Sequence, residues 1–451
     1  MKSILRIAFL LIIVTVIFTA CDKKTDDGTL SQEEEMAMQA NSCNGCHTNY
    51  EVLKAVYTPD PPSTGGAGCG GDVPHYEPYD RVYLGGTGYT DFKNSIHGQV
   101  ACTTCHNGTD NTADKAVAHS GDFIKKPSQS AEEKCATCHP AIYEKSHNSL
   151  HNQGWGQKRM VVERGGYDNF NSIPEHLAEG YEANCAKCHA SCGDCHVNRP
   201  IQGGGGLYAG HNFVKPDQRD HCTTCHVSRG GHAYYGVAIG TVPDVHLTKM
   251  GYKCVTCHST DEIHGDGVKY DTRYQMALKP ECTDCHSGME TANDYHAKHF
   301  DTFNCNVCHS QDYNNCGSCH VHGVGARIEA HQSFKIGMNP IPEIKPYKFA
   351  LLRQSLSAPD TWSNYGVDQL ATFDAHPTYK YTTPHNILKW TTRTEVEEGK
   401  ACYDACHIMA EGDTLRNKQL YLYEEDLLEW EKAADQGIIV DGKLPSYWKA
   451  N

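Results

Sequence analysis

The chain has 451 residues, a formal net charge of −15 and only 39% hydrophobic residues, with a mean hydropathy of −0.57. This acidic balance argues against nucleic acid or anionic lipid as a partner. So few apolar residues argue against the two or three ordinary globular domains that the length alone would predict.

Residues 1–20 predict an export signal. Lys2 and Arg6 give it a positive start, and residues 7–20 form an apolar stretch that is too short for a comfortable membrane span. The stretch ends at Cys21, followed by Asp22, and resembles the lipobox of bacterial lipoproteins. We therefore expect Cys21 to be acylated and to anchor the mature chain to a membrane, with a plain secretory peptide as the alternative. Removing Lys2 and Arg6 changes the formal charge from −15 to −17.

Residues 21–42 predict a polar tether that leads into a short helix, because Ser31 is followed by a run of glutamates. Residues 48–101 are rich in Gly, Pro and Tyr, which predicts a loop region with hairpin-like tyrosine segments and no helix. Cys69 lies in this region, outside any motif. It is interpreted as a free thiol, with a disulfide or an unusual ligand as alternatives.

Eleven cysteine–histidine motifs use 22 of the 24 cysteines. Ten have the spacing Cys-x-x-Cys-His, and the last, at residues 402–407, has one extra residue between its cysteines. Two such thiols add across the vinyl groups of one haem, and the histidine that follows becomes the proximal iron ligand. Zinc knuckles need no histidine at that position, and a disulfide framework leaves the histidines unexplained.

The sequence therefore predicts about eleven haem c groups, with a non-haem pair as the alternative at residues 402–407. In chain order, motifs 1 to 11 are Cys43, Cys46 and His47; Cys102, Cys105 and His106; Cys135, Cys138 and His139; Cys185, Cys188 and His189; Cys192, Cys195 and His196; Cys222, Cys225 and His226; Cys254, Cys257 and His258; Cys282, Cys285 and His286; Cys305, Cys308 and His309; Cys316, Cys319 and His320; Cys402, Cys406 and His407.

Histidines outside the motifs are numerous enough to provide a second axial ligand for every iron. Eleven of the 28 histidines belong to the motifs, which leaves 17. Bis-histidine ligation would lower the reduction potentials relative to Met/His ligation. The candidate ligands, chosen because they lie near motifs or in short loops, are His97, His119, His147, His151, His176, His211, His246, His264, His296, His299 and His385. The remaining histidines are His75, His221, His232, His322, His331 and His376; Met160, Met250 and Met276 are ligand alternatives that no pattern favours.

The motifs divide the mature chain into unequal regions. Residues 43–184 hold motifs 1–3, and residues 185–320 hold motifs 4–10. From His189 to Cys192 the chain spans at most about 10 Å, so haems 4 and 5 are expected in near contact. The four glycines at residues 203–206 predict a flexible loop.

The two regions that follow motifs 4–10 carry few or no haem motifs. Residues 321–401 are free of haem motifs and rich in aromatic residues and proline, and their rings are expected to pack over haem faces or against each other. Residues 402–451 hold the last motif and, at 420–436, apolar residues at helical spacing, which predict an amphipathic helix.

The fold class expected from these features is a multihaem cytochrome c. It would be mostly irregular coil with short helices and a few short hairpins, wrapped around a chain of haems. The porphyrins would supply much of the apolar surface that the polypeptide lacks.

Several connecting segments carry a family resemblance in addition to the motifs. They are residues 185–226, Ser228-Arg229-Gly230-Gly231, Val245-His246, Phe334-Lys335-Ile336-Gly337 and Thr383-Pro384-His385-Asn386. Over most of residues 90–407 the chain resembles the exported multihaem c-type cytochromes of metal-reducing bacteria, although the spacing at 402–407 departs from their pattern. The resemblance implies electron transfer between the periplasm or outer membrane and an extracellular or periplasmic acceptor. It also implies redox proteins or an outer-membrane conduit as partners, and a lipid-anchored position at the outer membrane, cell surface or periplasmic face.

Two other functions stay open. A multihaem reductase of nitrite, hydroxylamine or a sulfur oxyanion would need a five-coordinate haem with a polar distal pocket. The Cys-x-x-Cys-Lys motif that several such enzymes use does not occur in the sequence. A self-associating cytochrome filament would cap a haem of one copy with a histidine of the next, but a lipid on Cys21 opposes a long fibre.

Overall fold

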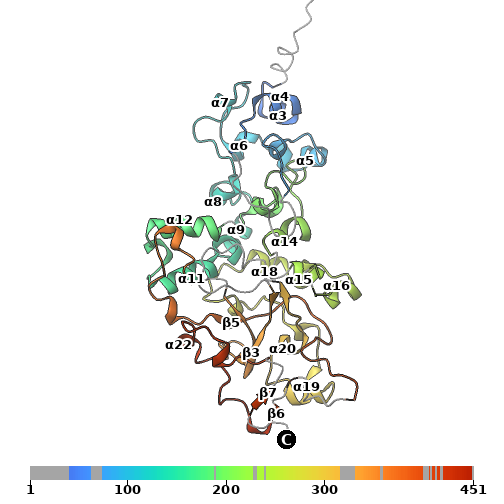
Figure 1. Cartoon of the computed structure of the whole chain (residues 1–451). Coiled ribbons are helices and arrows are strands. Elements are labelled where there is room, and N and C mark those ends of the chain that lie inside the picture. Colours follow the sequence, from blue (N-terminus) through green and yellow to red (C-terminus); the bar gives the residue numbers. More distant parts are fainter. Residues whose placement is uncertain are drawn as a thin grey trace, which may run out of the picture.

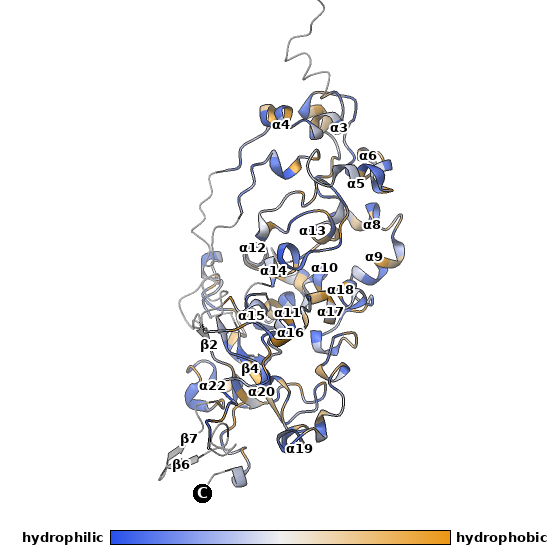
Figure 2. Ribbon diagram, turned by 90° about the vertical axis from the view of Figure 1, so that its right-hand side faces the viewer, coloured by the Kyte–Doolittle hydropathy of each residue, from blue (hydrophilic) through white to orange (hydrophobic). Residues whose placement is uncertain are grey.

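The computed structural model describes residues 40–61, 74–186, 189–226, 231–237, 240–314, 331–355, 359–399, 406, 409–411, 414–416 and 420–448. The predicted signal segment, Cys21, the tether up to residue 39 and Cys69 lie outside these residues, as do Cys188 of motif 4, motif 10 and most of motif 11. The molecule is elongated in both views, with the first motifs at one end and the last strands at the other (Figure 1, Figure 2). Within the described residues, no helix is long and apolar enough to cross a membrane.

Most helices are short, and several begin at a side-chain cap. Ser42, Ser149 and Asp244 each accept a hydrogen bond from a backbone N–H of the helix that follows. The helices are α3 (Cys43–Thr48), α4 (Tyr50–Val56), α5 (Tyr89–Asn94), α6 (Cys102–His106), α7 (Lys115–Ala118), α8 (Ala131–Lys134), α9 (Pro140–Ser146), α10 (Leu150–Gln153), α11 (Trp155–Gly165), α12 (Glu175–Asn184), α13 (Cys192–His196), α14 (Thr223–Cys225), α15 (His232–Tyr235), α16 (Val245–Met250), α17 (Cys254–Cys257), α18 (Thr260–His264), α19 (Asp294–His299), α20 (Asn306–His309) and α22 (Lys432–Asp435).

Tighter single turns connect many of these helices. The 3-10 turns are η1 (Asp80–Val82), η2 (His97–Gln99), η3 (Pro127–Ser130), η4 (Phe170–Ser172), η6 (Ile201–Gly203), η9 (Arg273–Gln275), η10 (Cys282–Asp284), η11 (Met289–Thr291), η13 (Ser363–Tyr365), η14 (Phe373–Ala375), η15 (Glu424–Asp426) and η16 (Ser446–Trp448). A π-helical turn, η7 (Gln218–Cys222), leads into motif 6. Such short elements leave little protein core around most motifs.

The prediction of no helix in residues 48–101 was wrong. α4 and α5 both lie in that region. Asn49 caps α4 by accepting a hydrogen bond from the Val52 N–H, and Val52 and Leu53 are buried. A good cap and two apolar anchors therefore outweigh the glycine, proline and tyrosine content of the region as a whole.

A small sheet forms the centre of the haem-motif-free region. Strands β3 (Lys335–Met338), β4 (Phe349–Gln354) and β5 (Tyr379–Tyr381) are antiparallel in the order β3-β4-β5, with Ile336 opposite Leu351 and Leu352 opposite Tyr381. Residues 349–353 are all buried, so β4 is covered on both faces. Two further strand pairs are β1 (Tyr313–Asn314) with β2 (His331–Gln332) and β6 (Met409–Glu411) with β7 (Thr414–Arg416).

The predicted amphipathic helix at 420–436 is also wrong. Residues 420–422 run beside β3 instead: the Ile336 N–H donates to the Leu420 carbonyl (2.7 Å), and the Leu422 N–H donates to the Ile336 carbonyl (2.9 Å). Within the predicted range 420–436, only η15 and α22 are helical. The three residues 420–422 are consecutively buried, which suits a strand covered on both faces better than one face of a helix.

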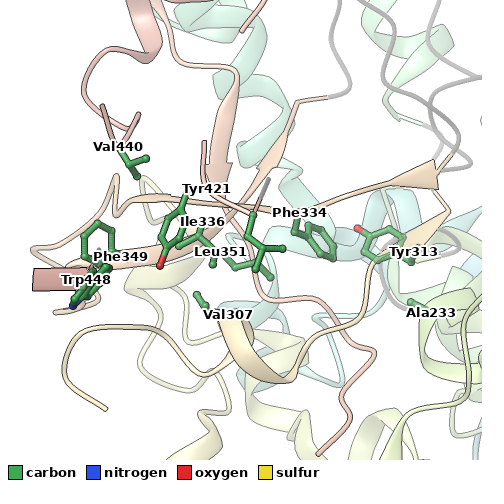
Figure 3. Packing of buried hydrophobic residues seen from close by; sticks show 11 residues of the cluster. Ala233, Val307, Tyr313, Phe334, Ile336, Phe349, Leu351, Tyr421, Val440 and Trp448 are labelled. Atoms are coloured by element: carbon green, nitrogen blue, oxygen red, sulfur yellow. The ribbon is translucent and has the colours of Figure 1, made fainter. Parts of the chain in front are cut away.

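The aromatic residues of the haem-motif-free region pack mainly against aromatic rings from outside that region. Figure 3 shows Phe349 beside Trp448, and their ring centroids are 5.3 Å apart. Ile336 and Leu351 lie in the same buried cluster. A second group places Trp362 and Phe373 against α11 and α12. The sheet and its flanking helices thus form a core of protein side chains.

The four glycines at 203–206 form a closely packed turn rather than a simple spacer. Gly204 and Gly206 both have positive φ, +95° and +78°. A Cβ on Gly204 would lie 2.4 Å from the Pro74 carbonyl oxygen, and one on Gly206 would lie 2.5 Å from the Arg81 Cβ. The flexible-loop prediction therefore missed the role of these residues in holding residues 74–82 against the segment after motif 5.

Candidate functional site: opposed histidines

Several motifs fold into a single helical turn that begins at the first cysteine. α3, α6, α13 and α17 all start in this way, at motifs 1, 2, 5 and 7. Residues three and four apart lie on one face of a helix, so the two thiols and the imidazole point to the same side. α3, α6 and α17 bury none of their own residues against protein. The motif turns therefore present their reactive side chains together, with no protein core beneath them.

Eight motif histidines each face one histidine from elsewhere in the chain. The pairs, motif histidine first, with the distance between ring centroids, are His47 with His119 (6.2 Å), His106 with His211 (5.9 Å), His139 with His97 (6.0 Å), His196 with His264 (6.2 Å), His226 with His151 (6.1 Å), His258 with His385 (5.9 Å), His286 with His246 (6.0 Å) and His309 with His296 (6.2 Å). All eight partners belong to the candidate ligands selected from the sequence.

The separation of these rings fits one metal ion between them. An imidazole nitrogen bound at about 2.0 Å puts its ring centroid about 3.1 Å from the metal, so two opposed rings are about 6 Å apart. The interplanar angle varies from 22° to 80° while the distance stays within 5.9–6.2 Å. Rings in direct contact would not combine such different interplanar angles with a constant distance, but two ligands on one axis would.

Hydrogen bonds at Nδ1 fix the orientation of half of these sixteen rings. Six of them donate Nδ1–H to a backbone carbonyl. They are His47 (to Val82, 3.1 Å), His106 (to Ile124, 2.9 Å), His196 (to Val214, 2.9 Å), His309 (to Leu388, 3.0 Å), His119 (to Lys115, 2.8 Å) and His151 (to Ile263, 3.3 Å). A proton held on Nδ1 leaves the lone pair on Nε2 to bind a metal, which is the usual arrangement around metal-binding histidines.

Two paired histidines donate to carboxylates instead. Nδ1 of His258 lies 2.8 Å from Oε2 of Glu262, and Nδ1 of His246 lies 3.0 Å from Oδ1 of Asp244. The sequence analysis did not identify these two carboxylates. The spacing of four residues from His258 to Glu262, and the aspartate just before Val245-His246, were visible signals, but their meaning depends on how the rings are turned.

Burial keeps several of the paired histidines neutral. Desolvation lowers the pKa of His385 to about 3 and that of His211 to about 4. At neutral pH both rings therefore carry no charge. The neutral imidazole is the form that binds metals.

A continuous cavity of about 3550 Å³ runs through the middle of the molecule. Its lining includes both members of five histidine pairs, those of motifs 5 to 9. A single ligand pocket is usually about 300–1,000 Å³. The cavity therefore has room for several large flat groups, one at each pair.

The cysteines of successive motifs lie next to one another. Side-chain hydrogen bonds join Cys135 to Cys192, Cys222 to Cys254 and Cys282 to Cys305. Further pairs lie close enough to interact electrostatically: Cys43 with Cys102, Cys105 with Cys135, Cys195 with Cys222, Cys257 with Cys285 and Cys308 with Cys406. These contacts order the motifs as 1, 2, 3, 5, 6, 7, 8, 9 and 11 in space.

Motif 4 has different surroundings. Nε2 of His189 lies 2.7 Å from the Tyr181 hydroxyl and 2.8 Å from Oε1 of Gln157. A Cβ on Gly154 would lie only 1.6 Å from the same nitrogen. Burial and then the charge of Lys158 lower the pKa of His189. In the part of the chain that the structure describes, His189 faces polar side chains and no second histidine.

The other three candidate ligands are placed as follows. His147 donates Nδ1–H to the Tyr143 carbonyl (3.2 Å), and His176 lies exposed in the first turn of α12; neither faces a motif histidine among the described residues. His299 donates to the Tyr295 carbonyl (2.8 Å), and its ring lies 5.7 Å from that of Phe303. Phe303 packs against the same buried cluster as Cys406 of motif 11.

Comparison with protein-family models, curated proteins and solved structures finds no match. Among the described residues, no group of three or more His, Cys, Asp or Glu side chains could hold a bare metal ion. The functional interpretation therefore depends on the sequence motifs and on the opposed histidines.

Proposed function

We propose that the chain binds about eleven c-type haems and transfers electrons along them. The eight opposed histidine pairs carry this proposal, because each pair would occupy both axial positions of one iron. Each bound haem would supply one reversible electron, through the ferric and ferrous states of its iron. A site closed by two imidazoles leaves no position for a substrate, which favours a carrier over an enzyme.

In this proposal the chain's own residues fix the order of the haems. The two cysteines of a motif would bind the porphyrin through thioethers, and the motif histidine and its partner would hold the iron. Because cysteines of successive motifs touch, the haem edges beside them would also lie close together. The contacts support a path through haems 1, 2, 3, 5, 6, 7, 8, 9 and 11, parallel to the long axis of the molecule (Figure 1).

The cellular setting is part of the same proposal. Covalent c-type haem is made outside the cytoplasm, which agrees with an export signal at residues 1–20. A lipid on Cys21 would hold the protein at the outer membrane, the cell surface or the periplasmic face. Its partners would be other redox proteins or an outer-membrane conduit.

The experiment is a haem count combined with magnetic circular dichroism of the purified protein. We expect eleven haems by intact mass, and at least eight low-spin bis-histidine haems that do not bind carbon monoxide when reduced. A protein without covalent haem, or one whose haems are mostly high-spin, would overturn the proposal.

A reductase is the second candidate, and His189 is the observation that favours it. The phenol of Tyr181, the amide of Gln157 and the ammonium of Lys158 could form a polar pocket at haem 4. Carbon monoxide binding by a single haem, together with turnover of nitrite or hydroxylamine, would support this function. If the wild-type protein binds no carbon monoxide, haem 4 also has two axial ligands, and the reductase is contradicted.

A further inference from the structure

Two neighbouring haem sites in the proposed path differ from the others in what supports their ligands. His258 of motif 7 donates to the carboxylate of Glu262, and His246, opposite motif 8, donates to that of Asp244. Six other paired histidines donate to neutral backbone carbonyls. Cys257 and Cys285 lie close together, so these two sites are adjacent. A charged acceptor is thus found at two consecutive sites in the middle of the path.

Asp244 is buried, with 2% of its side chain exposed. Its Oδ1 accepts hydrogen bonds from Nδ1 (3.0 Å) and from the backbone N–H (2.7 Å) of His246, and its Oδ2 accepts one from the Ile387 N–H (2.7 Å). Ile387 follows His385, the partner of motif 7, by two residues, and its carbonyl accepts from the Val245 N–H (2.9 Å). One carboxylate therefore holds the ligand segments of both sites in place.

Glu262 is fixed in a comparable way. It lies on α18, four residues after His258, and only 11% of its side chain is exposed. Ser259 caps the helix by accepting a hydrogen bond from the Glu262 N–H (3.1 Å). The Glu262 carboxylate is thus held against the His258 imidazole by local structure as well as by charge.

A carboxylate acceptor changes the ligand more than a carbonyl does. It draws the Nδ1 proton toward itself, which increases the basicity of the imidazole and strengthens its donation to the metal. Stronger donation stabilises the ferric state and lowers the reduction potential. Lys279 and Arg273 lie near His385 and favour the ferrous state of haem 7, but they act through space rather than through a ligand.

We propose that Glu262 and Asp244 are positioning residues that make haems 7 and 8 the low-potential pair of the path. The inference rests on the proposed electron-transfer function. Electrons would collect on haems 1, 2, 3, 5 and 6 and on haems 9 and 11 before haems 7 and 8 are reduced. Passage from one end of the molecule to the other would then be limited by this central step.

The test compares Glu262→Gln, Asp244→Asn and the double variant with wild type in the full-length, haem-loaded protein. Asp261→Asn is the matched control: it removes the same charge from α18, but its carboxylate is 66% exposed and pairs with Lys145. Haem content by intact mass is measured first. Spectroelectrochemical titration then follows the most negative part of the reduction curve.

Each single variant should move one of the eleven haems to higher potential, the double variant should move two, and the control should leave the most negative part of the curve unchanged. An unshifted curve in both single variants, or an equal shift in Asp261→Asn, would overturn the inference. If Asp244→Asn disturbs folding, Glu262→Gln alone decides, because Asp244 accepts backbone hydrogen bonds from two ligand segments, whereas Glu262 lies within the short helix α18. A protein with no haem would contradict the proposed function, and the mass measurement separates that outcome from failure of the inference.

Discussion

Replacement of His385 by alanine would remove one axial ligand from haem 7 and leave the other in place. The His385 ring lies 5.9 Å from that of His258, so its removal takes away the ring that faces this motif histidine. His258 would remain as the proximal ligand, so the iron of haem 7 should become five-coordinate and high-spin when reduced. The other haems should keep their ligands.

The size of the effect follows from the motif count. One haem in eleven, about 9% of the haem absorbance, should shift to a high-spin spectrum and bind one equivalent of carbon monoxide. Because His385 lines the cavity, its removal should leave space for an imidazole there. Added imidazole should therefore restore the low-spin spectrum and compete with carbon monoxide.

The assay is carbon monoxide titration of the dithionite-reduced protein, followed by optical difference spectroscopy. His376→Ala is the control, because His376 lies in the same region and faces no motif histidine in the described residues. The bis-histidine interpretation would be refuted if His385→Ala bound no more carbon monoxide than wild type. It would also be refuted if both variants bound it equally.

Four further outcomes are expected. Intact mass should correspond to eleven haems, and Cys406→Ala should reduce the count to ten; an unchanged count would mean that motif 11 is not loaded. Cys21→Ser should release a soluble, fully loaded protein from membranes, whereas a soluble wild type would contradict the lipid anchor. Replacing Cys192 and Cys195 by alanine should slow stopped-flow reduction of a soluble acceptor without changing its affinity, because haem 5 lies between haems 3 and 6; an unchanged rate would place the path elsewhere. Phe349→Ala should lower the stability of the sheet region by about 3–5 kcal/mol in denaturant unfolding, since its fully buried ring packs against several others; a cost under about 1 kcal/mol would contradict that packing.

The parts of the site that could be predicted from the sequence are those set by local spacing. Two cysteines and a histidine within five residues define a haem motif before any fold is known. The choice of candidate second ligands also needed only proximity to motifs and the number of histidines. The actual pairing, such as His385 with His258, depends on tertiary contacts between distant segments and left no signal in the sequence.

The errors have a physical basis as well. Apolar residues at 420–430 have a spacing that suits a helix, but residues 420–422 find a strand partner in β3, whose hydrogen bonds and burial override the periodicity. The three-stranded sheet was not predicted, because its short strands are separated by long connections. Glu262 and Asp244 were missed for a related reason, since a carboxylate beside a histidine acquires its role only when the ring is turned toward it.

The difference in interplanar angle between the opposed ring pairs has a spectroscopic consequence. The ring planes are close to parallel at motifs 3, 5 and 7, with interplanar angles of 25°, 22° and 24°, and close to perpendicular at motifs 1 and 6, both at 80°. The angle between axial imidazole planes sets the splitting of the iron d orbitals, and hence the g anisotropy of a low-spin ferric haem. Electron paramagnetic resonance should therefore divide the haems of this protein into a rhombic class and a strongly axial class with a large maximum g value. The signal of each class could then be followed separately during stepwise reduction of the protein.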